Sequence, residues 1–145
     1  MTATKTKRKN RRWTLAEKEA KLGPRPLCCN PGCGKPAYEN GHRWTPFCSS
    51  CRNVSQGRIK PLPGITYLRK NICGNWDGRY ALGFPCIIDW KVVKKNKIRV
   101  ITHMDHIDGN HLNNDSNNLQ ELCSYCHDEK GRLAGDKDPR KRVKP

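Results

Sequence analysis

Hydrophobic and polar positions alternate with different periods along the chain, and each pattern predicts a short element. Residues 14–24, TLAEKEAKLGP, have a threonine suited to an N-cap, a glutamate three positions later and a Gly-Pro stop, which predict a short charged helix. Residues 86–102, CIIDWKVVKKNKIRVIT, alternate β-branched and charged residues around Lys-Lys-Asn, which is typical of a β-hairpin whose second strand ends near Thr102. Residues 119–133, LQELCSYCHDEKGRL, have the composition of a helix. The pattern favours a small α+β fold.

Cysteine, glycine and proline dominate the segment that follows the first predicted helix. Residues 27–60 have the composition of loops tied by a metal and end in SSCRNVSQGRIK, which predicts a short helix; KPLPG at 60–64 is typical of a linker. Hydrophobic residues make up only 34% of the 145 residues, so we expect a thin core that needs a further stabilising device. The basic N-terminus, MTATKTKRKNRR, lacks the apolar run of a secretory signal. We therefore expect a reducing cytoplasm, in which cysteine pairs bind metal more often than they form disulfides.

The net charge of the chain indicates what kind of molecule it binds. The chain has 29 Lys and Arg against 13 Asp and Glu, a formal net charge of +16, and such a charge repels itself unless a polyanion offsets it. Nucleic acid is the expected partner, a membrane surface is a distant second, and no segment has the run of roughly 20 apolar residues that spans a membrane. The basic segments 5–12 and 136–145 are expected to be disordered in the free protein. Two all-cysteine zinc sites would lower the charge to about +12, which still favours a polyanion.

The first cysteine group suits a tetrahedral zinc. In LCCNPGCGKPAYENGHRWTPFCSSC, two cysteine pairs can each form a tight turn whose backbone N–H groups bond the thiolates. Either of two adjacent cysteines can join the site, and His42 is a less favoured ligand. With all four positions filled the zinc has a structural role. The expected ligands are Cys28 or Cys29, Cys33, Cys48 and Cys51.

A second cysteine group lies near the C-terminus, where Cys123 and Cys126 need partners from upstream. The only cysteines left in this half of the chain are Cys73 and Cys86, and Asp89 could replace one of them. A four-cysteine zinc formed in this way ties the predicted hairpin to the last helix. Its expected ligands are Cys73, Cys86, Cys123 and Cys126.

The most informative segment is residues 103–127, HMDHIDGNHLNNDSNNLQELCSYCH. The combination of DHIDGN, NNDSNNL and LCSYCHDEK resembles the HNH endonuclease family, which has a ββα-metal fold, and especially its small phage-encoded members. The resemblance covers roughly residues 71–131, including ICGNWDGRYALGFPC. Such proteins often carry an N-terminal cysteine pair with four residues between its members, which favours Cys28 over Cys29.

The resemblance implies a role for each member of the motif. His106 would be the general base, and histidine suits this because its unperturbed pKa is about 6.5. Asp105 and His127 would hold one catalytic divalent ion, and Asn118 would hydrogen-bond across the loop to orient His106. Gly131 stands where some members have one more histidine ligand. Two protein ligands leave a hydrated ion, which favours Mg²⁺ or Mn²⁺ over zinc.

Other polar residues of this half have simpler interpretations. Strand alternation would put His103 on the face of Asp105, where it could help to position a phosphate, whereas His111 is interpreted as a loop or substrate-facing residue. Asp108 and the neighbouring asparagines are interpreted as turn residues. Side chains of the predicted hairpin would grip DNA phosphates without reading sequence: Lys94, Lys95, Lys97 and Arg99.

Together these features predict four regions: an arm and helix (1–26), a zinc-binding module (27–60), a ββα-metal nuclease domain (61–135) and a basic tail (136–145). The expected function is a metal-dependent DNA endonuclease that nicks DNA or cuts both strands, as a monomer or a homodimer, in the cytoplasm of a phage host. A junction-resolving nuclease and a non-catalytic, zinc-containing nucleic-acid-binding protein are the alternatives.

Overall fold

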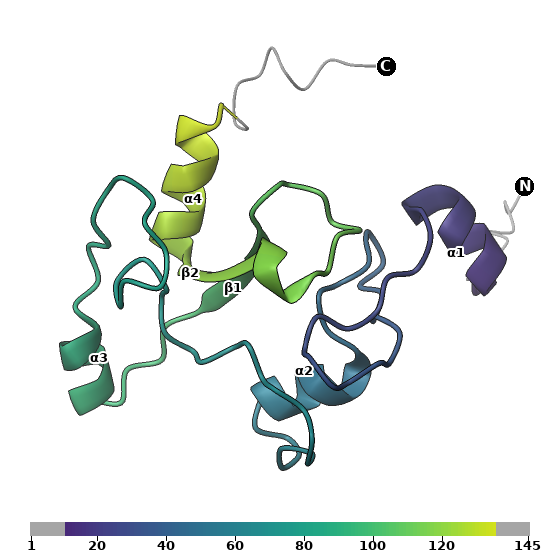
Figure 1. Cartoon of the computed structure of the whole chain (residues 1–145), viewed down its shortest axis with the longest axis horizontal. Helices are drawn as coiled ribbons and strands as arrows, with labels where there is room; N and C mark the ends of the chain where they lie inside the picture. Colours follow the sequence, from purple (N-terminus) through teal and green to yellow (C-terminus); the bar gives the residue numbers. More distant parts are fainter. Residues whose placement is uncertain (1–10, 136–145) are drawn as a thin grey trace, which may run out of the picture.

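A two-stranded antiparallel sheet lies at the centre of the protein, and the helices lie around it (Figure 1). The computed structural model describes residues 11–135; the predicted tail at 136–145 and most of the predicted arm at 5–12 lie outside this range. None of the helices in the described range is long and apolar enough to cross a membrane. The elements are α1 (Leu15–Leu22), α2 (Ser49–Ser55), α3 (Trp90–Lys95), β1 (Thr102–His106), the 3₁₀ turn η1 (Ser116–Asn118), β2 (Leu119–Cys123) and α4 (Ser124–Leu133).

The first predicted helix is confirmed as α1. The Thr14 hydroxyl accepts a hydrogen bond from the Glu17 N–H (3.2 Å), and the Glu17 carboxylate accepts one from the Thr14 N–H (2.7 Å), so the capping box is complete. Gly23, with φ of 85°, ends the helix in a conformation that a side chain disfavours. The Trp44 indole N–H donates to the Gly23 carbonyl (3.0 Å), which fixes the end of α1 on the N-terminal module, residues 27–60.

The β-hairpin predicted over residues 86–102 is wrong, because part of this segment is α3. The Asp89 carboxylate accepts hydrogen bonds from the N–H groups of Lys91 (2.9 Å) and Val92 (3.3 Å), and this cap starts the helix. Trp90 is buried, and Val93 packs against the same hydrophobic cluster one helical turn later. Helical spacing of these apolar residues therefore prevails over the β-branched composition, and a strand begins, instead of ending, at Thr102.

The helix predicted over residues 119–133 begins only at Ser124, and its first five residues form β2. Leu119–Cys123 pairs with β1 in a register that runs from Thr102 opposite Cys123 to His106 opposite Leu119. All five residues of β2 are buried, as expected for a strand covered on both faces. The Cys123 sulfur accepts from the Cys126 N–H (3.5 Å) and caps α4, so strand and helix meet without a loop.

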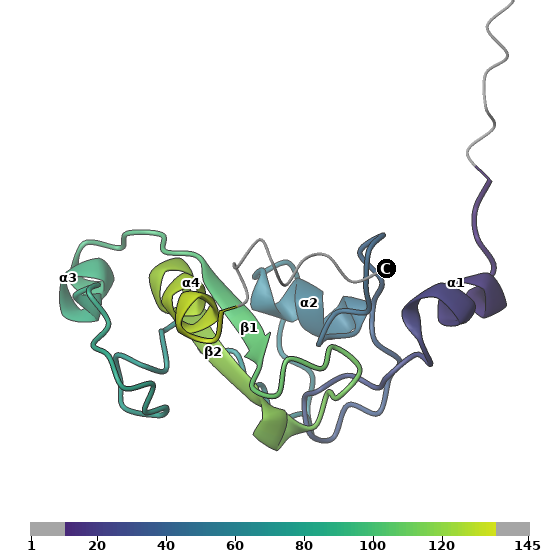
Figure 2. The same ribbon diagram turned by 90° about the horizontal axis from the view of Figure 1, so that it is seen from above.

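Two small hydrophobic clusters flank the hairpin, and β2 contributes to both. Leu119 packs with Phe47 and the cysteines of the N-terminal module. Leu122 packs with Trp90 and the second group of cysteines. Seen from above, α1 and α3 lie at opposite ends of the molecule with the hairpin and α4 between them (Figure 2). Cysteines make up much of each cluster, so the stability of this small α+β fold depends on what the cysteines bind.

A buried carboxylate fastens the segment before α3 to the hairpin. Glu121 has no exposed surface and accepts hydrogen bonds from the Lys70 N–H (2.7 Å) and the Thr102 hydroxyl (2.8 Å). The guanidinium groups of Arg79 and Arg69 lie 3.6 and 3.9 Å from its carboxylate oxygens. A buried carboxylate needs such partners, so Glu121 fixes the path of the chain that delivers Cys73 to the second cysteine group.

Candidate active site and metal-binding clusters

The last two residues of β1 present their side chains to different surroundings. Successive strand residues point to opposite faces of a sheet. Asp105 lies opposite Gln120 and contacts α4, whereas His106 lies opposite Leu119 and contacts the loop between β1 and β2. The two residues of the DH motif are therefore adjacent in sequence but have separate partners.

The first turns of α4 bring two side chains to the Asp105 carboxylate. His127 Nε2 lies 3.7 Å from Asp105 Oδ1, and the Lys130 ammonium hydrogen-bonds to Oδ2. The Gln120 amide also donates to Oδ2 (2.8 Å). A carboxylate oxygen and an imidazole nitrogen at this separation can share one divalent ion, because each ligand atom lies about 2.1 Å from such an ion. The His127 side chain is 44% exposed, so water can fill the other coordination positions.

Sequence reasoning missed Lys130 and Gln120. Lys130 follows His127 by three residues, so the two share one face of α4, and this spacing was the available signal. The Lys130 ammonium also lies 3.3 Å from the His106 carbonyl oxygen. Lys130 therefore bridges the strand positions of Asp105 and His106. Gln120 could have been found only from the register of the two strands.

His103 lies on the Asp105 side of β1, as alternation predicts, and its ring is 5.3 Å from that of His127. Its Nε2 lies 3.0 Å from the Ser124 hydroxyl. Burial, followed by the proximity of His127, lowers the pKa of His103. At neutral pH this histidine is therefore uncharged and can meet a phosphate by hydrogen bonding.

His106 is only 4% exposed, and both of its ring nitrogens have partners. Nε2 lies 2.9 Å from the side-chain oxygen of Asn114, and Nδ1 lies 3.3 Å from Nδ1 of His111. The rings of His106 and His111 are nearly perpendicular, at 87°. The imidazole is thus held from two sides by the loop between the strands.

Asn118 hydrogen-bonds across the loop, and its link to His106 runs through the loop backbone. Within residues 11–135, the amide that contacts the His106 ring is that of Asn114. The Asn118 amide donates to the Asp108 carboxylate and to the Asn113 carbonyl, both at 2.9 Å, and accepts from the Asp108 N–H (3.1 Å). Asn118 closes the loop beside His106, because its carbonyl accepts the Ile107 N–H (2.8 Å), and its side chain braces the loop and not the imidazole.

Asp108 fills the turn role that its sequence position suggests. Hydrogen bonds from the side chains of Asn113 and Asn118, and from the Asn110 N–H, lower the pKa of Asp108 to about 2. Its carboxylate is thus fully ionised at neutral pH and engaged by the loop. Asn113 and Asn110 serve the turn in the same way, as donors inside the loop.

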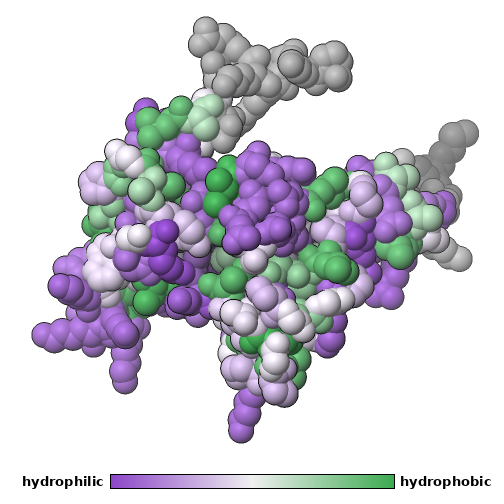
Figure 3. Space-filling view, in the orientation of Figure 1, coloured by the Kyte–Doolittle hydropathy of each residue, from purple (hydrophilic) through white to green (hydrophobic). Residues whose placement is uncertain are grey.

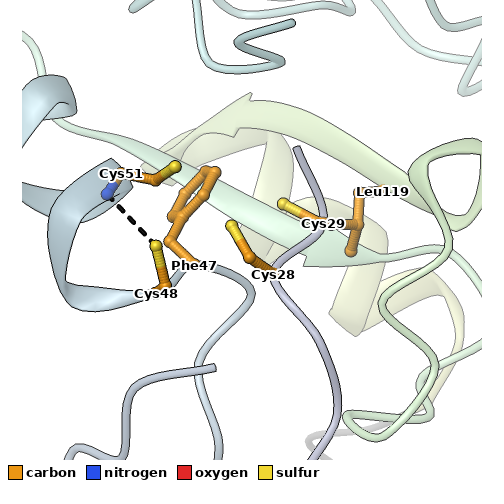
Figure 4. Close-up of a cluster of buried hydrophobic side chains, with 6 residues drawn as sticks. All are labelled: Cys28, Cys29, Phe47, Cys48, Cys51 and Leu119. Atoms are coloured by element: carbon orange, nitrogen blue, oxygen red, sulfur yellow. Dashed lines mark hydrogen bonds between the residues drawn. The ribbon is translucent and has the colours of Figure 1, made fainter. Parts of the chain in front are cut away.

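The first cysteine group converges on one point. The Cys33 sulfur lies 3.6 Å from that of Cys48 and 3.6 Å from that of Cys51. A tetrahedral zinc with bonds of about 2.3 Å places its sulfurs about 3.8 Å apart, so the group fits zinc. Cys29 lies outside the group and packs beside Leu119 (Figure 4). The four sulfurs that lie within 4.8 Å of one another are those of Cys28, Cys33, Cys48 and Cys51.

The second group also converges, although its first two members are far apart in sequence. The sulfurs of Cys86 and Cys123 are 3.8 Å apart, which again matches the edge of a zinc tetrahedron. Asp89, the alternative ligand, instead caps α3. Burial raises the pKa of Cys123 to about 11, so a bound dication is needed to keep this thiol ionised at neutral pH. The four sulfurs within 4.8 Å of one another are those of Cys73, Cys86, Cys123 and Cys126.

The basic residues predicted to grip DNA line a groove instead of a hairpin. Lys94, Lys97 and Arg99 border a groove of about 990 Å³ that reaches β1 at Thr102. Four more lysines and arginines line it, and no aspartate or glutamate does. Hydrophilic side chains project from the region of α3, at the lower left of Figure 3. Lys95 is exposed at the end of the same helix, next to the groove.

The hairpin, its loop and the following helix form a ββα unit, with Asp105, His106 and His127 at their junction. The family model of the HNH endonuclease matches residues 90–133, from the first residue of α3 to the last residue of α4. The match supports, for these residues, the resemblance to the HNH endonuclease family seen in the sequence. An HNH nuclease domain acts on nucleic acid. Searches of curated proteins and of solved structures gave no match.

Proposed function

We propose that the protein is a metal-dependent DNA endonuclease that hydrolyses phosphodiester bonds, by nicking or by double-strand cleavage. The observation that carries this proposal is the approach of His127 to Asp105 beside His106, within the segment that the HNH family model matches. A candidate ion-binding pair and a candidate base at one end of β1 support the proposal. Hydrolysis of a phosphodiester needs both functions.

Asp105 and His127 are the proposed ligands of one Mg²⁺ or Mn²⁺ ion. When bound, such an ion stabilises negative charge on the phosphate and on the leaving oxygen. The 3.7 Å separation and the exposed His127 ring fit a hydrated ion with few protein ligands. Lys130 compensates the Asp105 charge in the free protein through Oδ2, so Oδ1, the oxygen nearer His127, would be the one to hold an ion.

His106 is the proposed general base, which accepts a proton from the attacking water. Its burial and its two ring contacts hold the imidazole in one orientation. Asn118 supports this arrangement indirectly, because its backbone carbonyl accepts the Ile107 N–H (2.8 Å) and its side chain holds Asp108. The proposed role of Asn118 is therefore to fix the loop that carries the partners of His106.

The two four-cysteine groups are proposed to bind structural zinc. Four sulfurs complete a tetrahedral zinc and leave no open position for chemistry. The first site would stabilise the N-terminal module, 27–60, and the second would join the chain before α3 to α4 within the proposed nuclease domain, 61–135. Zinc binds these cysteines as reduced thiolates, which fits the proposed location in the cytoplasm of a phage host.

DNA contacts are proposed along the basic groove and beside the active site. Lysine and arginine side chains in a groove without acidic residues attract the phosphate backbone and read little sequence. His103 would add a hydrogen bond to a phosphate next to the ion. The proposed backbone contacts are Lys94, Lys95, Lys97 and Arg99.

One assay separates the endonuclease from the two alternatives. Purified protein is incubated with supercoiled plasmid, linear duplex and a four-way junction, each with Mg²⁺, Mn²⁺, Ni²⁺ or chelator. The proposal predicts ion-dependent cleavage of plasmid and linear duplex. Cleavage restricted to the junction would identify a junction-resolving nuclease. Binding of all substrates without cleavage under any condition would identify a non-catalytic nucleic-acid-binding protein.

A further inference from the structure

A chain of hydrogen bonds joins the N-terminal module to both nitrogens of the His106 ring. Asn114 contacts Nε2, and its amide reaches backbone carbonyls of the module. His111 contacts Nδ1, and its other nitrogen lies 3.4 Å from the guanidinium of Arg43 in the same module. The candidate base of the nuclease domain is therefore held at both ends by residues of the segment 27–60.

The carbonyl end of this chain fixes the orientation of Asn114. Its side-chain nitrogen donates to the Leu27 carbonyl at 2.9 Å, with the Thr45 and Pro46 carbonyls at 3.3 and 3.4 Å. Carbonyl oxygens only accept, so the atom facing them must be the NH₂ group. The Asn114 oxygen is then the atom facing His106, and it also only accepts. His106 Nε2 must therefore carry the proton, which leaves the lone pair on Nδ1.

The contact between Arg43 and His111 leads independently to the same protonation of His106. A guanidinium has donors and no acceptor, so His111 Nε2 must accept from Arg43. Burial, followed by the charge of Arg43, lowers the pKa of His111, which agrees with a neutral ring. The proton of that ring is then on Nδ1, where it can donate to His106 Nδ1. In this series of hydrogen bonds every donor meets an acceptor, so one protonation pattern of His106 and His111 satisfies all of the bonds.

The carbonyls that receive the Asn114 amide are held by the turns of the first cysteine group. Leu27 directly precedes Cys28, whose N–H donates to the Lys35 carbonyl (2.8 Å). The Pro46 carbonyl accepts the Cys29 N–H (2.8 Å), two residues before Cys48. One ligand of the first proposed zinc thus directly follows Leu27, and another lies two residues after Pro46, so closing the cluster also fixes the carbonyls that hold Asn114.

We propose that the N-terminal zinc module is part of the active site, with Asn114 as the positioning residue that connects it to His106. Asn114 holds His106 in the form protonated at Nε2 and directs the Nδ1 lone pair to the attacking water. The His111 N–H occupies that lone pair in the free protein and gives way when water enters. The part played by water rests on the proposed nuclease function, whereas the protonation of His106 in the free protein does not.

Nitrogen NMR of ¹⁵N-histidine-labelled protein tests the positioning directly. At a pH well above the imidazole pKa of about 6.5, the two ring nitrogens of a neutral histidine are distinguishable as protonated and unprotonated. The His106 signals are assigned by their loss in His106→Gln. We expect wild type to be protonated at Nε2, and Asn114→Leu to show a mixture of both forms. Asn117→Leu, at an exposed position of the same loop, is the matched control and keeps the wild-type pattern.

Kinetics of plasmid nicking with Mn²⁺ give the second measurement. Asn114→Leu is expected to lower kcat about 10- to 100-fold with KM within about twofold of wild type, because DNA contacts are unchanged while the base is misoriented. Asn117→Leu is expected to match wild type in both constants.

The outcomes separate the inference from the proposed function. A wild-type His106 protonated at Nδ1 overturns the inference, as does an Asn114→Leu protein with unchanged ring protonation. If Asn114→Leu fails to fold, the wild-type spectrum still tests the inference, because it shows which nitrogen of His106 carries the proton. If wild type cuts no DNA but is protonated at Nε2, the proposed function fails and the hydrogen-bonded link from module to His106 stands.

Discussion

The His127 imidazole lies 3.7 Å from the Asp105 carboxylate, although one residue belongs to α4 and the other to β1. This pair predicts one Mn²⁺ site. Replacing Asp105 or His127 by alanine is expected to weaken Mn²⁺ binding at least about tenfold, since each side chain supplies one ligand atom. Electron paramagnetic resonance of free Mn²⁺ measures the affinity. His42→Ala, at an exposed histidine of the N-terminal module, is the control; equal affinity in all variants would exclude this pair as the site.

The two cysteine groups predict two zinc ions per chain. Cys86→Ser is expected to leave one zinc, because it removes a ligand from the second group only. Cys29→Ser provides a matched control at a buried cysteine outside both groups and is expected to retain two. Elemental analysis of purified protein by mass spectrometry gives the count. A Cys29→Ser protein with a single zinc would show that Cys29, not Cys28, completes the first site.

The buried Glu121 carboxylate predicts a large effect on stability. Glu121→Gln removes the charge that faces Arg69 and Arg79 while preserving the shape of the side chain. We expect the free energy of unfolding to fall by about 2 kcal/mol, less than for a fully buried pair because both guanidiniums keep access to solvent. Urea denaturation at saturating zinc measures this change in the free energy of unfolding.

The control for this experiment is Glu129→Gln in α4, where the carboxylate pairs with the exposed Arg132 at 2.5 Å. Surface pairs within a helix contribute little, so the change there should stay below about 0.5 kcal/mol. Equal losses in the two variants would refute a special role for Glu121.

The basic groove predicts a change in the salt dependence of DNA binding. Replacing both Lys94 and Lys97 by glutamine should reduce the slope of log K against log salt by about two, because each lost phosphate contact removes about 0.9. Fluorescence anisotropy with a labelled duplex, in chelator to prevent cleavage, measures the slope. Lys21→Gln, in α1 at the other end of the molecule, should leave it unchanged (Figure 2). A double variant with the wild-type slope would place the DNA elsewhere.

Replacing His111 is expected to change kcat in the opposite direction from replacing His106, or to leave it unchanged. Because its N–H covers the Nδ1 lone pair of His106, His111→Ala exposes this lone pair to water without removing the base. The Asn114 contact at Nε2 remains and still orients the ring, so the kcat for plasmid nicking should equal or exceed the wild-type value. If kcat falls as far as in His106→Ala, then His111 takes part in the reaction itself.

Local signals in the sequence predicted those parts of the fold that local interactions determine. Thr14 and Glu17 satisfy each other within one turn, so the start of α1 was readable. The prediction for residues 86–102 was wrong, because their β-branched residues suggested strands, whereas the Asp89 cap and the buried Trp90 determine a helix. β2 was missed for a different reason: its partner, β1, is separated from it by the whole loop, and composition does not reveal pairing.

In the candidate site, too, some residues could be predicted from local sequence and others could not. Motif spacing pointed to Asp105, His106 and His127, and the structure places them at one junction. Asn118, the residue expected to orient His106, hydrogen-bonds across the loop, whereas the amide in contact with the ring is that of Asn114. Among several asparagines of one loop, the one that reaches His106 is decided by the carbonyls of the N-terminal module, and no local pattern encodes that tertiary contact.

The rate of plasmid nicking by His106→Ala, compared with wild type at saturating Mn²⁺, tests the central claim most directly. We expect at least about a 100-fold loss in His106→Ala, with Mn²⁺ and DNA affinities unchanged, because the variant lacks only the group that takes the proton. A variant that nicks at the wild-type rate would contradict the assignment of His106 as the base and, with it, this account of the active site.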